Sequence, residues 1–123
     1  MGGQKKILVV EDSQDIRSIL SMRLVINGYD VVTAVDGQEG LDKARDEHPD
    51  LIMLDLMLPK IDGYEVCRML KFDDKYKNIP IIILSALDQQ EDREKATKSG
   101  ADAYFIKPFD LELLLTKIKK LIM

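Results

Sequence analysis

The sequence predicts an α/β fold: a doubly wound, five-stranded parallel sheet with helices on both faces. Five apolar runs have strand length, and the segments between them have helical spacing. These runs span residues 7–10, 31–34, 51–54, 81–84 and 103–106. They are continuously apolar, which is typical of strands buried on both faces. Because parallel strands need right-handed crossovers, the intervening helices are expected to cover both sides of one sheet.

The first two helices are expected after the first and second strands. After Asp12, apolar residues recur on one helical stripe, formed by Ile16, Leu20 and Leu24. The dipeptide Asn27-Gly28 is a typical signal for the end of that helix. Residues 38–47 form a short second helix.

The last three helices follow the third, fourth and fifth strands. From Gly63, small and apolar residues recur at i, i+3, i+4 and i+7, namely Gly63, Val66, Cys67 and Leu70. The C-terminal segment repeats this spacing with Leu111, Leu114, Leu115, Ile118 and Ile122. Between them, "DQQEDREKATKSG" has few apolar residues besides Ala96, and we expect a helix that ends at Gly100.

The four prolines lie at the boundaries of this scheme. Pro49 and Pro80 stand just before predicted strands, and Pro59 and Pro108 just after them. The pattern is therefore a strand–helix unit repeated five times.

Composition limits the class of protein. The 123 residues, 46% hydrophobic and 33% charged, suit one domain over residues 6–123, preceded by a disordered extension at 1–5. The net charge of −4 argues against direct nucleic-acid binding, which needs fields of Lys and Arg. No apolar run approaches the ~18 residues of a membrane span. A single cysteine, Cys67, excludes an internal disulfide and fits a reducing cytoplasm.

Polar side chains gather where the predicted strands end. Glu11 and Asp12 follow the first strand, Asp55 the third, Ser85 the fourth and Lys107 the fifth. In a doubly wound sheet, ligands bind outside the carboxyl ends of the strands, so these groups are expected at one binding edge.

The residue types at this edge indicate phosphoryl chemistry. Two carboxylates about 5 Å apart repel by roughly 3 kcal/mol at an effective dielectric near 20. Oxygen ligands without imidazole or thiolate favour Mg²⁺ or a similar ion such as Mn²⁺. An aspartate is already ionised at neutral pH, so Asp55 is expected to attack phosphorus directly and form an aspartyl phosphate.

Four motifs, in order and spacing, resemble the receiver domain of bacterial two-component response regulators, of the single-domain chemotaxis-regulator type. They are "ILVVEDS", "LIMLDLMLPKIDG", "IIILSA" and "YFIKPF", and the resemblance covers nearly the whole chain. It implies a flavodoxin-like strand order of 2-1-3-4-5.

The resemblance also implies a role for each acidic residue. Asp55 corresponds to the phosphoacceptor. Asp12, Asp55 and the backbone carbonyl of Met57 correspond to ligands of Mg²⁺ (or Mn²⁺), and Glu11 to an acid that acts through a water molecule.

The remaining site residues are assigned by the same resemblance. Ser85, Ala86 and Lys107 correspond to phosphate-binding residues, and the Lys107–Pro108 peptide is expected to be cis. Tyr104 corresponds to an aromatic residue that moves inward when Ser85 turns toward the phosphate.

Partners are likewise implied by the resemblance. The family receives its phosphoryl group from a sensor histidine kinase, a phosphotransfer protein or a small acyl phosphate. A downstream protein target, which the sequence does not identify, is expected on the surface made by the fourth helix, fifth strand and fifth helix. No output domain follows the fifth helix, so we expect a stand-alone regulator or part of a longer one, acting as a signalling domain and not as an enzyme.

Met57 and Leu87 are apolar at positions where other members carry groups that orient attacking water. We therefore expect slow self-dephosphorylation.

Other interpretations of these residues stay open. An aspartate-nucleophile phosphatase usually has a second aspartate where this chain has Met57. A flavin carrier needs a hydroxyl-rich phosphate loop where Glu11 and Asp12 stand. A receiver-like adaptor that is never phosphorylated is a further alternative. Asp12 alone is also compatible with a simple helix cap.

Overall fold

The computed structural model of the protein describes residues 4–122, in which five strands and five helices alternate. The strands are β1 (Lys6–Val10), β2 (Asp30–Ala34), β3 (Leu51–Asp55), β4 (Ile81–Ser85) and β5 (Ala103–Ile106). The helices are α1 (Gln14–Ile26), α2 (Gly37–Glu47), α3 (Gly63–Lys71), α4 (Gln90–Lys98) and α5 (Leu111–Ile122).

The strands form one parallel sheet in the order β2-β1-β3-β4-β5, which confirms the predicted fold class and strand order. Two strands are longer at their carboxyl ends than predicted. Asp55 pairs with Leu84, and Ser85 pairs with Ile106, so the ladder continues through both polar residues. Asp55 and Ser85 are therefore the last residues of strands and not the first residues of loops.

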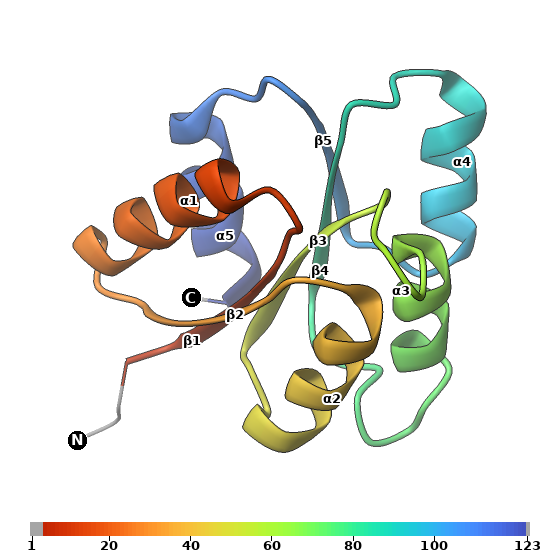
Figure 1. Ribbon diagram of the computed structural model, residues 1–123, viewed down its shortest axis with the longest axis horizontal. Coiled ribbons are helices and arrows are strands. Elements are labelled where there is room, and N and C mark those ends of the chain that lie inside the picture. The colour runs from red at the N-terminus through yellow and green to blue at the C-terminus, as the bar shows by residue number, and fades with distance from the viewer. Residues whose placement is uncertain (1–3, 123) are drawn as a thin grey trace.

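Helices cover both faces of the sheet (Figure 1). On one face, α1 and α5 pack over a core that includes Ile7, Leu20, Met53 and Leu114. On the other face lie α2, α3 and α4. This arrangement buries every residue of β3 and β4, as their continuous apolar sequences predict.

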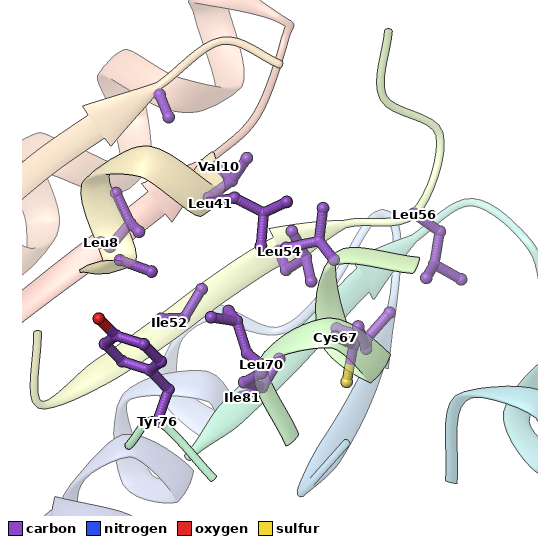
Figure 2. Packing of buried hydrophobic residues seen from close by; sticks show 14 of the residues in the cluster. Leu8, Val10, Leu41, Ile52, Leu54, Leu56, Cys67, Leu70, Tyr76 and Ile81 are labelled. Carbon is purple, nitrogen blue, oxygen red and sulfur yellow. The ribbon is translucent and has the colours of Figure 1, made fainter. Parts of the chain in front are cut away.

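The core beneath α2 and α3 is formed by the alternate residues of the central strands (Figure 2). Leu8 and Val10 of β1 and Ile52 and Leu54 of β3 point to the same side of the sheet. Leu41, Cys67, Leu70 and Tyr76 close the cluster from the helices and from the loop after α3. This core fixes the strand ends that carry the polar residues.

Three helices begin with a side-chain cap directly after a strand or loop at the same edge. The caps are Ser13 for α1, Asp36 for α2 and Asp62 for α3, and each accepts a hydrogen bond from a first-turn amide. Ser13 Oγ accepts from the Ile16 amide at 3.4 Å. The interpretation of Asp12 as the cap of α1 is therefore wrong, because the neighbouring serine has that role.

The predicted disordered extension covers residues 1–5, and its first three residues lie outside the described range. The Lys5 carbonyl accepts a hydrogen bond from the Asp30 amide at 2.9 Å, just before β1 and β2 pair. Within residues 4–122, no helix has the length and apolar character needed to cross a bilayer.

Candidate functional site

Three carboxylates meet at the carboxyl edge of the sheet. Glu11 and Asp12 follow β1, and Asp55 ends β3, which pairs with β1. One carboxylate oxygen from each of the three lies within 4.8 Å of the others. Glu11 and Asp55 are buried, whereas Asp12 is exposed, so the cluster opens to solvent on the Asp12 side.

Lys107 brings the only side-chain ammonium that forms an ion pair with this cluster in residues 4–122. Its Nζ lies 2.7 Å from Glu11 Oε1 and 3.0 Å from Asp55 Oδ2. The backbone amide of Lys107 donates to the Ser85 carbonyl at 2.8 Å, which fixes the residue beyond the end of β5. One ammonium thus bridges two buried carboxylates that come from different strand ends.

Burial and pairing act on the pKa values of this pair in different ways. Burial raises the pKa of Glu11, and the hydrogen bonds from Lys107 and from the Ser13 amide offset only part of that effect. For Lys107, burial alone lowers the pKa, but the hydrogen bonds to Glu11 and Asp55 outweigh it and raise the pKa. Lys107 is therefore a firmly protonated cation at neutral pH.

Backbone and guanidinium groups hold the two acids that follow β1. The Ser13 amide donates to Glu11 Oε2 at 3.0 Å. Arg17 Nη1 donates to the carbonyl of Glu11 at 2.8 Å and to that of Asp12 at 3.4 Å. Sequence reasoning missed Arg17. Its place in the first turns of α1 is the available signal, since long helical side chains point back toward the helix N-terminus.

The loop after β3 also contacts Asp55. The Met57 amide donates to Asp55 Oδ1 at 3.1 Å, so both oxygens of this carboxylate accept a hydrogen bond. The Met57 side chain is exposed, and no donor in residues 4–122 is bonded to its backbone carbonyl. Gly63 packs so closely that an added Cβ would lie 2.3 Å from the Asp55 carbonyl oxygen.

Ser85 lies at the same edge but is not bonded to the acids. Its side chain is fully buried, and its Oγ accepts a hydrogen bond from the Leu87 amide at 3.1 Å. Within the described residues no hydrogen bond joins Ser85 to Glu11, Asp12 or Asp55. Ala86 follows as an exposed residue at the start of the loop to α4.

Tyr104 links β5 to the same loop. Its hydroxyl donates to the Leu87 carbonyl at 2.7 Å, and its half-buried ring packs against the core beneath α2 and α3. Burial raises the pKa of Tyr104, so the hydroxyl stays protonated and able to donate. The Lys107–Pro108 peptide is cis.

A hollow of about 520 Å³ lies beside the cluster. Its walls include Asp12, Met57 and Leu87, together with Tyr64 of α3 and Lys95 of α4. The Lys95 ammonium lies 4.3 Å from the centre of the Tyr64 ring. The hollow gives a small polar molecule access to the carboxylates, and the side chains of Met57 and Leu87 make part of its wall apolar.

The arrangement combines hard oxygen ligands, a fixed cation and an ionised carboxylate. Three carboxylates and one ammonium leave an excess of two negative charges when all are ionised. Such a site favours a divalent cation with oxygen ligands over zinc, because it has neither histidine nor cysteine.

Comparison with known proteins gives a consistent family. The family model of the response regulator receiver domain matches residues 7–119. The DNA-binding dual master transcriptional regulator RpaA of Synechocystis sp. is 45% identical over 117 residues, which cover 95% of this chain and 48% of the relative. The alkaline phosphatase synthesis transcriptional regulatory protein PhoP of Bacillus subtilis is 45% identical over 118 residues, with 96% and 48% covered. The solved structure of Vibrio cholerae chemotaxis protein CheY4 aligns with a TM-score of 0.90 at 33% identity, covering 98% of this chain and 100% of that one.

The chain spans about half the length of these two curated relatives, since 48% of each is covered. Both are named transcriptional regulators, and one is named DNA-binding. The expectation that nucleic acid is not a direct partner therefore has no support from the relatives, although the net charge of this chain is −4.

The ion pairs of Lys107 predict a stability effect. Lys107→Met leaves the buried Glu11 carboxylate without its cation, and we expect it to lower the free energy of unfolding by about 2 kcal/mol, below the usual cost of breaking a buried pair because the site opens to water. Adding Glu11→Gln to this variant should recover part of the loss. Urea unfolding of the two single variants and the double variant measures both effects, with Lys77→Met on an exposed pair as the control. A double variant less stable than Lys107→Met would contradict this explanation.

Proposed function

Because the chain belongs to the response regulator receiver domain family, we propose that it is a signalling switch whose Asp55 accepts a phosphoryl group. The observation that carries the proposal is the position of the Asp55 carboxylate, 3.0 Å from the Lys107 ammonium and within 4.8 Å of oxygens from Glu11 and Asp12. A carboxylate held between a cation and a cluster of anionic oxygens is suited to attack phosphorus once the incoming charge is neutralised.

The donor set supports Mg²⁺, or Mn²⁺ in its place, as the cofactor. Asp12, Asp55 and the Met57 carbonyl would hold the ion, with Glu11 contributing through a water molecule. The absence of a bonded donor on the Met57 carbonyl within residues 4–122 fits this role. When bound, the ion would supply positive charge that screens the repulsion between the carboxylates and the phosphoryl oxygens.

In the proposed transfer, a side-chain oxygen of Asp55 forms a bond to phosphorus. The bond between phosphorus and the donor atom breaks, and the leaving group departs with that electron pair. The donor atom is an imidazole nitrogen of a phosphohistidine or an oxygen of a small acyl phosphate. Lys107 remains protonated and stabilises the negative charge of the phosphoryl oxygens.

The phosphoryl group would then alter the loop between β4 and α4. Ser85 Oγ would exchange its bond to the Leu87 amide for one to a phosphoryl oxygen, and the Ala86 amide would donate to another. The Leu87 carbonyl holds the Tyr104 hydroxyl at 2.7 Å, so a shift of this loop is transmitted to β5. The surface made by α4, β5 and α5 is the proposed readout.

The proposed partners are a phosphoryl donor and a target. The donor is a sensor histidine kinase or a phosphotransfer protein, and the target binds the surface of α4, β5 and α5. Since the curated relatives are about twice as long as this chain, the target belongs either to another protein or to a further part of the same one. A role in transcription, as the relatives' names describe, is compatible with both.

Asp55→Asn tests the phosphoacceptor directly. Incubation of the native protein with acetyl phosphate and Mg²⁺ should add the mass of one phosphoryl group, because the carboxylate is the nucleophile. Asp55→Asn should gain no such mass, whereas Asp46→Asn, at an exposed site on α2, should react like the native protein. Intact-mass spectrometry measures the outcome. Phosphorylation of Asp55→Asn, or none of the native protein, would refute the proposal.

Met57→Asn tests the basis of slow hydrolysis. The Met57 side chain offers no hydrogen bond to an attacking water, whereas an amide at this exposed position does. We expect the aspartyl phosphate of Met57→Asn to decay about tenfold faster, equivalent to about 1.4 kcal/mol of activation free energy.

The decay is followed by intact mass after removal of the phosphodonor. Met22→Asn changes an equally exposed methionine on α1 and should leave the lifetime unaltered. An unchanged lifetime in Met57→Asn would count against the role of this apolar wall.

A further inference from the structure

We infer that Gly37, at the start of α2, is a positioning residue for the metal site because it fixes the loop that carries the Met57 carbonyl. The β3–α3 loop, residues 56–62, runs from the end of β3 to the cap of α3. The inference rests on the proposed function, since it assigns a role to a residue outside the acidic cluster in holding a ligand of that site.

The contact between Gly37 and this loop has no room for a side chain. A Cβ at Gly37 would lie 1.9 Å from the Ile61 carbonyl oxygen and 2.7 Å from its carbonyl carbon. These are backbone atoms, so a rotamer change cannot relieve the overlap. Any residue other than glycine must therefore move the loop or the first turn of α2.

A hydrogen bond and an ion pair hold the same contact. The Gly37 amide donates to the Pro59 carbonyl at 3.2 Å, and the Ile61 amide donates to that carbonyl at 2.9 Å. Between them, Lys60 has a φ of 71°, an uncommon conformation for a residue with a side chain. Its Nζ lies 3.6 Å from Asp36 Oδ2, and a hydrogen bond from the Glu39 amide together with this lysine lowers the pKa of Asp36.

The other end of the loop is attached to the phosphoacceptor strand. The Gly63 amide donates to the Leu56 carbonyl at 2.9 Å, and the Met57 amide donates to Asp55 Oδ1 at 3.1 Å. Met57 thus lies between an anchor on β3 and α3 and an anchor on α2. Movement of Pro59 and Ile61 away from Gly37 changes the direction of the Met57 carbonyl relative to Asp12 and Asp55.

Gly40 provides a matched comparison on the same helix. A Cβ at Gly40 would lie 2.9 Å from a side-chain methyl of Val10 and would not meet the loop among its nearest neighbours. Gly37→Ala and Gly40→Ala therefore introduce the same methyl group into buried sites of α2. Only the first changes the position of the loop that carries Met57.

Mg²⁺ titration followed by the amide chemical shifts of Asp12, Asp55 and Met57 tests the inference without a phosphodonor. Gly37→Ala should weaken Mg²⁺ binding by about tenfold, the size of effect typical of losing a group that orients a metal ligand. Gly40→Ala should bind Mg²⁺ within about twofold of the native protein, even where it unfolds at a lower urea concentration.

Lys60→Gly serves as a second variant because Lys60 is exposed and its positive φ suits glycine. It removes the ion pair to Asp36 and makes the loop more flexible, so its urea midpoint should stay close to the native value while Mg²⁺ binding weakens about threefold. A purely structural role for this contact predicts the opposite pattern, in which affinity is unaltered wherever the protein is folded.

The result separates this inference from the proposed function. If the native protein binds Mg²⁺ and Asp12→Ala does not, but folded Gly37→Ala and Lys60→Gly bind it like the native protein, only the inference is wrong. If the native protein and Asp12→Ala respond alike to Mg²⁺, the proposed metal site itself is wrong.

Discussion

The bridge from the Lys107 ammonium to the carboxylates of Glu11 and Asp55 is the interaction on which this edge of the molecule depends. The parallel sheet brings three acids within 4.8 Å, and burial raises the pKa of Glu11. One lysine, 17% exposed in its side chain, holds two of them at 2.7 and 3.0 Å. Since one ammonium cannot neutralise three carboxylates, the residual negative charge attracts a divalent cation, and the same charge makes the fold locally unfavourable without one.

The same strand ends connect this charge cluster to a mobile part of the surface. Ser85 ends β4 beside Asp55, the Leu87 amide donates to its hydroxyl, and the Leu87 carbonyl accepts from Tyr104. The helix that follows, α4, has only Ala96 buried among its residues, so little apolar contact opposes its movement. A change of one hydrogen bond at Ser85 therefore acts on the least firmly packed helix of the molecule.

Sequence patterns predicted the sheet, its covering helices and the residues at its edge, because continuous apolar runs and strand-end polar residues are local signals. They did not predict contacts that depend on loop conformation. Arg17 binding the carbonyls of Glu11 and Asp12, and Gly37 meeting the Ile61 carbonyl, both require the positions of segments remote in sequence. The cap of α1 was open to two interpretations, since Asp12 and Ser13 are adjacent and both suit an N-cap; Ser13 has the role. The extension of the β3 and β4 ladders through Asp55 and Ser85 follows from pairing with neighbouring strands, which apolar runs alone do not show.

The central claim is that the acidic cluster binds a divalent cation beside Asp55, and it is tested most directly by anomalous diffraction from a crystal containing Mn²⁺. The account predicts one strong anomalous peak in contact with carboxylate oxygens of Asp12 and Asp55 and with the Met57 carbonyl, and its loss in crystals of Asp12→Ala. A cluster without a peak at saturating Mn²⁺, or a peak that persists in Asp12→Ala, would contradict it.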